Sequence, residues 1–579
     1  MWYALIRLLQ RHRLNLTVIF LYLLFTSIFT FPLFLRISTS TPLADGSGDQ
    51  FQSMWLFWWF KTALLKLHTN PLYTNFIYHP QGSSLIYHLS IFLSLLALPF
   101  QYLFGTPGNS IISHNLILIF TFVFSGFGVY LLTKYLVKDS VTAFICGLLF
   151  AFCPYRLWHL NHLNLLGTEW IPFYILYLFK SVDKKSLKNF FWAGLFFILS
   201  FLSSLTYGFF LVLFSLFYLF YLLIISRKQL LDKRFIKNSS IVIFTVIIIL
   251  SPLIYNLYSH KIDWQPSIED TARYSANLAG YFLPDKERSV LGGHFLPSRL
   301  HYHGISGGEL FFGYILLFFA IYTWIRFRRK KIGFWLFSSL AFFLLSFGHT
   351  IHIFANSYYF KWLPYNLLYT YVPLFRIGRT PCRFSLMVTL CLIIFSSYGL
   401  TRFFRLSITQ NKNLSDVKNF LRGFLTRKGI PIVVVMLICL EFIVFPTMLI
   451  RVGIPECYEK IKNTKEEFAI LELPAFCYES SLMCNLYMFY QTFHGKKVVN
   501  GYLSRPSNYS KDFLNQILSQ ENTTPRKISF EVDTLKLAKT NVKYILMHES
   551  DKLKQVKIED PGCLVIEEES SRIKIIQVF

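Results

Sequence analysis

Charge is scarce in this chain of 579 residues: Asp, Glu, Lys and Arg together make up 15% of it, and only 31 residues are acidic. Hydrophobic residues make up 54% of the sequence, and the mean hydropathy is +0.44. Soluble globular domains carry about 25% charged residues, so this composition excludes a soluble protein of ordinary type. The sequence also lacks an internal repeat and a low-complexity segment, which excludes solenoids and arrays.

Motifs of the common soluble enzymes are missing too. The sequence has no glycine-rich phosphate loop, no serine-nucleophile elbow and no kinase motif set, which argues against a soluble nucleotide sugar as the immediate substrate. Cysteine is sparse, and the cysteines of the C-terminal part do not have a zinc-binding spacing. A disulfide among them stays open: Cys457, Cys477, Cys484 and Cys563.

What the chain has in abundance is apolar runs long enough to cross a bilayer as helices. They predict about eleven transmembrane helices, the first of which is kept as an anchor. The predicted spans are 14–36, 110–134, 140–154, 165–180, 188–203, 205–226, 237–258, 308–326, 332–350, 383–401 and 429–450.

The net charge of +26 comes from basic residues in short connectors between these runs. Examples are Arg7, Arg11 and Arg13 before the first span, the segment 326–331, and the segment 402–428. Basic connectors are typical of cytoplasmic loops, so the N-terminus is predicted to be cytoplasmic. No basic run is interleaved with stacking aromatics outside the spans, which excludes nucleic acid as a partner.

The same rule sorts the other loops. The apolar stretch 88–104 is interpreted as re-entrant or interfacial, because an ordinary crossing there would place Lys134 outside. Outside then lie the first loop 37–109, the turn 154–165, the loops 259–307 and 351–382, and everything after the last span.

The C-terminal part has a different sequence pattern. It contains the strand-like runs "EFAILELP", "KKVVNGYL", "VKYILMH", "CLVIEEE" and "RIKIIQVF", separated by polar stretches that suit helices. We therefore expect an all-α polytopic membrane bundle over residues 1–450 and a small extracytoplasmic α/β domain over residues 451–579.

The first loop carries the most informative stretch, "LADGSGDQFQSMWLFWWF", at residues 43–60. Asp45 and Asp49 flank "GSG", which favours a tight turn. The following alternation of polar and aromatic residues predicts an interfacial helix, with Trp55, Trp58 and Trp59 at the level of the lipid headgroups. A helix-capping role for Asp49 is the alternative to a chemical one.

Several segments make the chain resemble the GT-C superfamily of integral-membrane glycosyltransferases, and more narrowly a prokaryotic multi-pass group within it. They are "GDQFQSMWLFWW", "NPLYTNFIYHPQG", "FAFCPYRLWHLNHLNLL", "LPYNLLYTYVPLFRIGRTPCRF" and "YQTFHGKKVVNGYLSR". The order of elements is also similar: one span, an acidic first external loop, many further spans and an external C-terminal domain.

The resemblance implies transfer of a sugar from a polyprenyl-phosphate donor to an acceptor in the cell envelope, which can be a glycan, a lipid or a protein. An acidic residue of the first loop would remove the acceptor proton. Asp49 matches that position best, and Asp45 is the alternate. The phosphate leaving group calls for cationic donors at the same depth.

Such donors occur in "FRIGRTPCRF", which holds Arg376, Arg379 and Arg383 just outside a span. They are candidates for binding the donor phosphate, and snorkelling to ordinary lipid phosphates is the alternative.

The turn "CPYRLWHLNHLNLLGTEW" brings Arg156, His159 and His162 to the membrane edge, and Glu309 lies at the mouth of another span. These four are candidates for substrate binding. A divalent metal held by Asp49 and the two histidines is the minority alternative, so no metal ligand and no cofactor are assigned.

Two other classes stay open: a transporter or flippase of a lipid-linked saccharide, and a non-catalytic membrane assembly protein. A transporter would be expected to show charges within its spans and internal symmetry. Here Glu441 is a clear charge within a span, and no two halves of the chain resemble each other.

Overall fold

The computed structural model describes most of the chain. The described residues are 2–43, 47–104, 109–259, 266–285, 308–327, 330–372, 375–376, 378–409, 429–444, 446–473, 481–503, 505, 515–516, 518–524, 527–532, 537, 539–548, 553–558, 564–568 and 573–577. Asp45 therefore lies outside the described residues.

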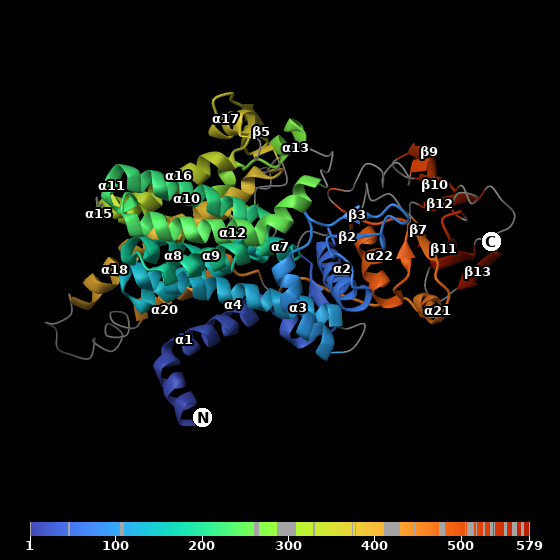
Figure 1. Ribbon diagram of the computed structural model, residues 1–579, viewed down its shortest axis with the longest axis horizontal. Helices are drawn as coiled ribbons and strands as arrows, with labels where there is room; N and C mark the ends of the chain where they lie inside the picture. The colour runs from blue at the N-terminus through green and yellow to red at the C-terminus, as the bar shows by residue number, and fades with distance from the viewer. Residues whose placement is uncertain are drawn as a thin grey trace.

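A bundle of apolar helices fills one end of the molecule (Figure 1). Its helices are α1 (Trp2–Phe29), α4 (Asn109–Val137), α5 (Ser140–Ala151), α8 (Trp170–Lys184), α9 (Leu187–Ser203), α10 (Leu205–Ile225), α12 (Lys233–Ser259), α15 (Tyr314–Arg326), α16 (Lys330–Ser346), α18 (Ser385–Thr409) and α20 (Ile430–Phe442). Each predicted span overlaps one of these helices. Within the described part of the chain, five helices are long and apolar enough to cross a membrane, so the number of crossings stays a prediction.

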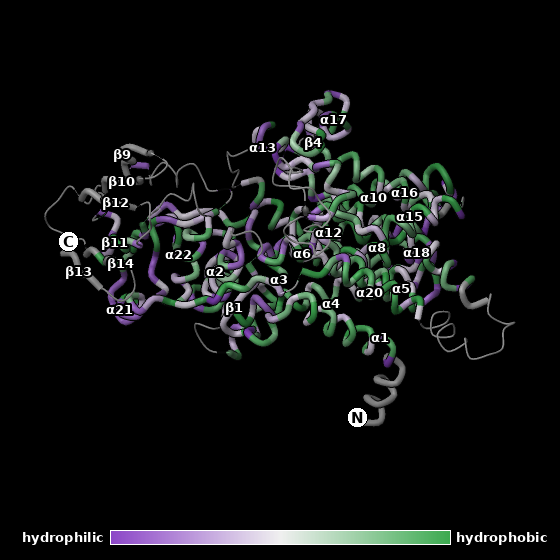
Figure 2. The backbone as a smooth tube through the Cα atoms, turned by 180° about the vertical axis from the view of Figure 1, so that it is seen from behind, coloured by the Kyte–Doolittle hydropathy of each residue, from purple (hydrophilic) through white to green (hydrophobic). Residues whose placement is uncertain are grey.

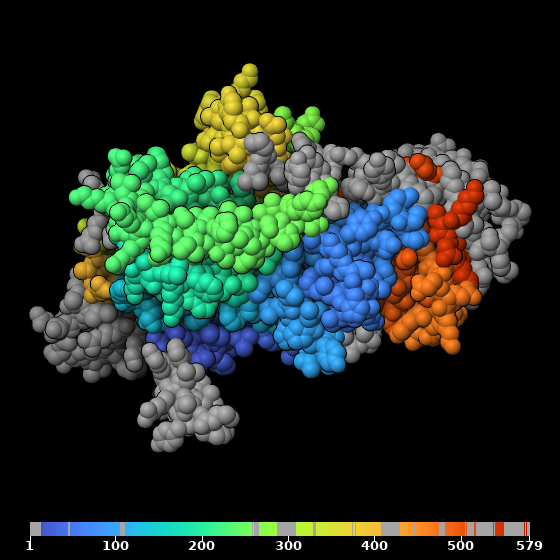
Figure 3. All heavy atoms as spheres, in the orientation of Figure 1, coloured from blue at the N-terminus to red at the C-terminus, as the bar shows by residue number. Residues whose placement is uncertain are grey.

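The bundle is layered by burial. In α18, 94% of the most apolar window is buried inside the protein, which makes it the central helix, whereas in α12 the share is 11%. Figure 3 shows α12 as a light green band on the surface, beside the teal helices. An apolar helix with so much exposed surface is suited to contact with lipid, and several apolar helices of this kind indicate a membrane protein.

The stretch interpreted as re-entrant or interfacial contains α3 (Ile91–Leu103), a helix of 13 residues. About 20 residues are needed to span the hydrocarbon core, so α3 is too short for an ordinary crossing. It packs against α2, α4 and α9, while Leu95, Tyr102 and Leu103 stay exposed.

A short antiparallel β-ladder connects the segment after the first helix of the bundle with the segment after the last one. Strand β1 (Ser40–Pro42) follows α1, strand β6 (Leu449–Arg451) follows α20, and the two pair antiparallel with Thr41 opposite Ile450. The chain therefore leaves α1 and α20 at the same end of the bundle. The C-terminal residues therefore start beside the first loop.

A five-stranded mixed sheet lies at the other end of the molecule (Figure 1). Its order is β13-β14-β11-β7-β8, with β7 parallel to both β8 and β11, and with β14 antiparallel to both β11 and β13. The five strand-like runs of the sequence each contain one of these strands, which are β7 (Ala469–Leu473), β8 (Lys497–Val498), β11 (Val542–His548), β13 (Leu564–Glu568) and β14 (Ile573–Gln577).

The helices α21 (Cys457–Asn463) and α22 (Ser481–His494) accompany the sheet, and Cys484 in α22 is disulfide-bonded. A second sheet, β12-β10-β9, was not predicted. Its strands are β9 (Leu518–Thr524), β10 (Lys527–Val532) and β12 (Leu553–Ile558). In Figure 2 the bundle is mainly hydrophobic in colour, whereas the C-terminal part is mixed.

The first loop lies between the bundle and the sheet (Figures 1 and 3). It contains α2 (Asp49–Thr62), a π-helical turn η2 (Ala63–Leu67), and the hairpin of β2 (Tyr73–Thr74) with β3 (Ser83–Ser84). Helix α2 packs against α22, α3 and α4.

The position predicted for the tryptophans of α2 is wrong. Trp55, Trp58 and Trp59 are 0%, 9% and 2% exposed, and they share a hydrophobic core with residues of the sheet region such as Leu471 and Val499. Residues of the C-terminal part therefore cover the apolar face that was expected to meet lipid. An amphipathic pattern shows that a face is apolar but does not say which apolar surface covers it.

Candidate active site

Asp49 is the first residue of α2, and Gly48 before it has a φ of 77°. A Cβ at position 48 would lie 2.9 Å from the Cα of Leu482 in α22, so both the backbone angle and the close approach require glycine here. The N-cap residue is Gly48, which has no side chain, and the backbone N–H of Asp49 donates to the hydroxyl of Ser47 over 3.4 Å. The carboxylate of Asp49 instead faces His162 and Asn485, so the capping alternative is not what the structure shows.

The contact with His162 is the tightest that Asp49 makes. Its Oδ2 lies 2.7 Å from Nδ1 of His162, and its Oδ1 accepts a hydrogen bond of 3.3 Å from Nδ2 of Asn485. The side chains of Asp49 and His162 are 26% and 20% exposed, so a substrate can reach both. The imidazole of His162 and the amide of Asn485 fix the orientation of the Asp49 carboxylate. Its oxygens keep further lone pairs, which can accept a proton.

His159 forms a second acid–base pair next to the first. The turn that holds both histidines consists of α6 (Pro154–Trp158) and α7 (Leu163–Leu166), and the two rings meet edge to face with centroids 5.6 Å apart. Nδ1 of His159 donates to the backbone oxygen of Tyr155 over 2.6 Å. Nε2 is thereby left to face Oε2 of Glu309 at 3.1 Å.

Glu309 belongs to η4 (Gly308–Leu310) and is buried. Its other oxygen accepts a hydrogen bond of 3.0 Å from the thiol of Cys382, in η6 (Pro381–Phe384). A buried carboxylate is costly unless it is paired, and Glu309 has partners on both oxygens. The histidines thus contact carboxylates of two other segments, α2 and η4, and each carboxylate is held by a further segment. The sequence analysis did not name Cys382 as a residue of this site.

Three arginines are the candidates for the cationic side of the site: Arg379, Arg383 and Arg505. Arg379 lies over the ring of Tyr274 at 4.7 Å and donates to its hydroxyl over 2.8 Å. Arg383 in η6 is half-buried, and its Nε has no hydrogen-bond partner among the described residues. Arg505, from the C-terminal part, lies over the ring of Tyr87 at 4.9 Å.

These arginines act on one another. The pKa of Arg505 falls to about 10, first because the side chain is buried, and further because the charges of Arg383 and Arg379 repel its proton, while Tyr87 raises it. The guanidinium group of Arg505 therefore stays protonated at neutral pH. Sequence reasoning did not assign Arg505, although it closes the segment "YQTFHGKKVVNGYLSR", which carried part of the resemblance.

Electrostatics tie the carboxylate side to the cationic side. Burial raises the pKa of Tyr502, the charge of Asp49 raises it further, and the charge of Arg379 lowers it. The pKa of His88 falls to about 4 because of burial and the charge of Arg505, while Asp49 opposes the shift. The pKa values of Tyr502 and His88 thus respond to the charge of Asp49 and to that of an arginine.

Two predicted residues lie elsewhere. Arg376 is exposed, and its guanidinium donates to the backbone oxygens of Tyr369 and Thr370, at the end of α17 (Pro364–Tyr371), over 3.1 and 2.8 Å. Arg156 is fully buried, where it donates to the backbone oxygens of Ala151 and Leu166 over 3.0 and 2.8 Å. Arg156 thereby fixes the turn that carries the histidines.

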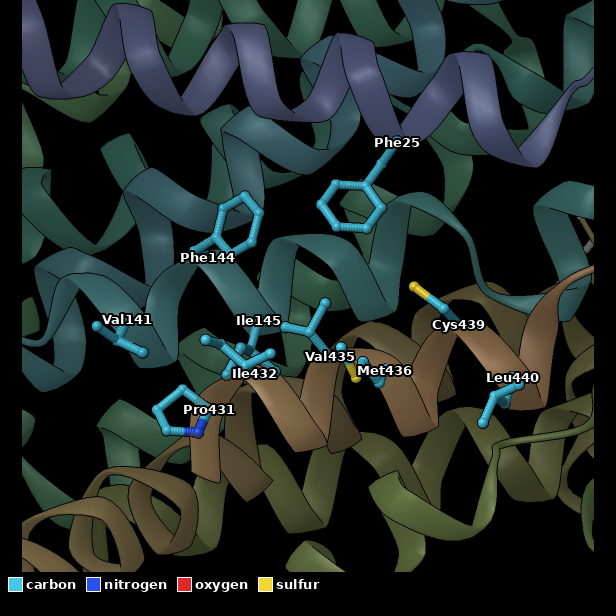
Figure 4. Close-up of a pocket in the computed structure, with 10 residues that line it drawn as sticks. All are labelled: Phe25, Val141, Phe144, Ile145, Pro431, Ile432, Val435, Met436, Cys439 and Leu440. Atoms are coloured by element: carbon cyan, nitrogen blue, oxygen red, sulfur yellow. The ribbon is translucent and has the colours of Figure 1, made fainter. Parts of the chain in front are cut away.

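No group of three or more His, Cys, Asp or Glu side chains suited to a metal ion occurs among the described residues. A cavity of about 680 Å³ lies between α1, α5 and α20, lined by apolar residues such as Phe25, Ile145 and Val435 (Figure 4). None of the candidate site residues lines it.

The family described as "domain of unknown function (DUF6311)" matches residues 18–410 of the chain. The chain belongs to this family. In this DUF6311 protein, the matched segment contains the two histidines, Glu309, Cys382 and the arginines of "FRIGRTPCRF", whereas Arg505 lies beyond it. No curated protein matches the chain.

Solved structures are similar to this DUF6311 chain at low identity. One is the archaeal oligosaccharyltransferase AglB from Archaeoglobus fulgidus in complex with an inhibitory peptide and a dolichol-phosphate, with a TM-score of 0.50 and 14% identity over 93% of this chain and 70% of that one. Another is the oligosaccharyltransferase of the same organism in the apo form, with a TM-score of 0.48 and 13% identity over 92% of this chain and 69% of that one. The first match shows that the DUF6311 chain has an AglB-like fold.

Proposed function

We propose that this protein is a GT-C-type membrane glycosyltransferase that transfers a sugar from a polyprenyl-phosphate donor to an extracytoplasmic acceptor. The observation that carries the proposal is the pairing of a partly exposed carboxylate, Asp49, with His162, next to the buried pair of His159 and Glu309. The fold supports it, because the similar AglB structure holds a dolichol-phosphate and a peptide.

The chemistry assigns one task to each side of the site. Asp49 removes the proton of the acceptor hydroxyl or amide, and the freed electron pair forms the new bond to the anomeric carbon. The bond between that carbon and the phosphate oxygen breaks, and its electron pair leaves with the lipid phosphate. Arg379 and Arg383 stabilise the charge that develops on this leaving group.

His162 positions the base. Its contact of 2.7 Å with Oδ2 holds the Asp49 carboxylate in one orientation. The buried pair of His159 and Glu309 supports the ring of His162 from behind.

Glu441, the clear charge within a predicted span, has a structural role. The carboxylate oxygens of Glu441, in α20, accept hydrogen bonds from the backbone N–H groups of Tyr314 and Ile315. These groups belong to the first turn of α15, where a helix leaves N–H groups without partners inside the helix. Glu441 thus caps a helix, and this weakens the argument for transport.

Transfer by the purified full chain tests the proposal. The protein in lipid nanodiscs is given polyprenyl-phosphate-linked radiolabelled sugars and a mixed pool of acceptors, and product is separated by chromatography. We expect transfer by the wild type and a loss of about 100-fold or more for Asp49→Asn, the range of general-base catalysis. Asp232→Asn, which removes a carboxylate paired with Lys185 at the other end of the bundle, should keep wild-type activity. Equal transfer by Asp49→Asn, or none by the wild type, would refute the proposal.

A further inference from the structure

Exposed aromatic side chains gather on the connection between α16 and α18. This connection forms the hairpin of β4 (Thr350–Ile353) with β5 (Asn356–Tyr359), followed by α17, and we refer to the hairpin and α17 together as the lobe. All four residues of β5 are exposed, and so is the face of α17 that carries Leu367 and Tyr371, one turn apart. The aromatic surface of the lobe consists of six exposed residues: Tyr358, Tyr359, Trp362, Leu367, Tyr371 and Val372.

The inner side of the lobe is packed and hydrogen-bonded. Nδ1 of His349 donates to Oδ1 of Asn366, and Nδ2 of Asn366 donates to the backbone oxygen of Phe360 over 2.8 Å. Asn366 thereby ties α17 to both ends of the hairpin. On the same helix, the buried Tyr365 donates its hydroxyl to the backbone oxygen of Gly378 over 3.1 Å. The aromatic surface is therefore the outer side of a well-supported lobe.

The lobe extends sideways from the bundle. In Figure 1, α17 and β5 lie beyond α16 and α10, whereas the five-stranded sheet lies beyond the end of the bundle, and Figure 2 shows the lobe at the same place from behind. Helix α12 runs lengthwise along the bundle in Figure 3, where the yellow spheres of the lobe project across that direction. Lipid surrounds a membrane bundle on its sides, so the lobe extends in the direction of the lipid.

The level of the lobe along the bundle is that of helix ends. The hairpin begins directly after α16 ends at Ser346, and the chain enters α18 at Ser385 soon after α17. A bilayer has its headgroups near the ends of the apolar helices that it surrounds. The position of the lobe, at the side of the bundle and level with helix ends, is thus the membrane–water interface.

The composition of the lobe fits this place. Tryptophan and tyrosine are enriched at membrane–water interfaces, because each has an apolar ring and one polar group. Lysine and arginine beside them can reach lipid phosphates while their apolar stems stay in contact with the rings. From residue 350 to residue 383 the chain contains no Asp or Glu and four residues that are Lys or Arg: Lys361, Arg376, Arg379 and Arg383. Rings and positive charges without carboxylates are complementary to phospholipid headgroups and the chain segments below them.

We propose that the aromatic surface is inserted into the headgroup region of the bilayer and anchors the connection between α16 and α18 there. This inference goes beyond the proposed function and does not depend on sugar transfer. The chain continues from α17 to Cys382, which contacts Glu309 of the candidate site. The anchor therefore also sets the depth at which the candidate site meets the membrane.

Tryptophan fluorescence of the full chain in nanodiscs tests the inference. The discs contain phospholipids whose acyl chains are brominated close to the headgroup, because bromine quenches only rings that lie among these lipids. The emission of one tryptophan is the difference between the wild type and its Trp→Phe variant. Trp362→Phe reports on the aromatic surface. Trp324→Phe, in the apolar helix α15, is the matched control for lipid contact, since Trp324 is 65% exposed and Trp362 is 66% exposed. Trp335→Phe is the control for a ring inside the protein, with 1% exposure.

We expect brominated lipid to remove the emission of Trp362 to the same extent as that of Trp324, and to leave the emission of Trp335 unchanged. Iodide in the surrounding water should quench Trp362 much less than a free indole. Tyr371→Trp places a new ring on α17 without removing one, and we expect brominated lipid to quench it as well. This second variant keeps the test decisive if Trp362→Phe does not fold.

Two results would overturn the inference. One is quenching of Trp362 and of Tyr371→Trp by iodide, with equal emission in brominated and ordinary lipid, which would place the aromatic surface in water. The other is protection from iodide that arises only when a soluble oligosaccharide is added, which would assign the rings to a glycan. Neither measurement needs a donor or an acceptor, so a protein that transfers no sugar tests the anchor equally well.

Discussion

Gln491 in α22 is the residue through which the C-terminal part is most directly hydrogen-bonded to the first loop. Its Oε1 accepts from the indole N–H of Trp55 over 2.7 Å, and its Nε2 donates to the backbone oxygens of Phe76 and Lys496 over 2.6 and 2.8 Å. The side chains of Gln491 and Trp55 are fully buried. We therefore predict that Gln491→Leu, which has a similar size, loosens the packing of α22 against α2.

The magnitude follows from the bonds that are lost. Each ordinary hydrogen bond contributes about 1 kcal/mol, and a buried N–H left without an acceptor costs about 1–3 kcal/mol, so the substitution should cost about 3 kcal/mol in all. A cost of about 3 kcal/mol corresponds to an increase of roughly 100-fold in the population of the locally open state.

Hydrogen exchange of the protein in nanodiscs, read by mass spectrometry, measures this population for the peptides that cover α2 and α22. Gln52→Leu is the matched control: Gln52 also reaches across to the C-terminal part, with one hydrogen bond of 2.8 Å to the backbone oxygen of Tyr502, but it is only partly buried. Water replaces a lost partner at such a position, so the cost should stay near 1 kcal/mol, about the value of one bond. If Gln491→Leu and Gln52→Leu accelerate exchange equally, the reasoning from buried hydrogen bonds is refuted.

Three further predictions concern the site and the pH range of stability. His162→Gln should lower kcat about tenfold to 100-fold, change donor KM little and alter the pH dependence of kcat, because it disturbs the orientation of Asp49; an unchanged pH profile would count against a positioning role. Arg379→Gln should raise the apparent donor Kd about tenfold, whereas Arg376→Gln, which only loses contacts with α17, should leave it unchanged in the same binding assay. Burial lowers the pKa values of His88 and His494 to about 4 and about 3, so both are neutral in the folded protein while the unfolded chain takes up their protons below about pH 6.5. Stability should therefore fall as the pH drops from about 6.5 toward 4, by up to about 1.4 kcal/mol per pH unit for each histidine, and His494→Gln should reduce that slope in unfolding experiments at pH 7 and pH 5.

Local properties of the sequence were sufficient to predict most elements. Each apolar run overlaps one helix of the bundle, although α1 begins 12 residues before its predicted start and α20 ends eight residues before its predicted end. The five strand-like runs of the C-terminal part became the five strands of one sheet, because hydropathy and periodicity act over a few neighbouring residues. The covering of the tryptophans of α2 could not be predicted, since Trp55 and its partner Gln491 are 436 positions apart.

For the candidate site, too, some residues could be predicted from the sequence and others could not. Sorting the polar residues by side of the membrane placed Asp49, the two histidines and Glu309 together, and the structure brings these residues into contact. It could not distinguish Arg379 from Arg376, three residues away, because the difference lies in whether backbone carbonyls of α17 are within reach. Arg505 carried no local signal beyond its place at the end of a segment typical of the family.

The shared core of α2 and the C-terminal sheet has a consequence for biosynthesis. The tryptophans of the first loop leave the ribosome long before the residues that cover them, since Trp55 and Gln491 lie 436 positions apart. At a synthesis rate of about 5–20 residues per second, that interval is roughly 20–90 seconds. During this time a large aromatic surface is exposed beside the membrane without its partner. Correct folding of the first loop therefore waits until late in synthesis, and a chain truncated before β7 would be a substrate for chaperones and quality-control proteases.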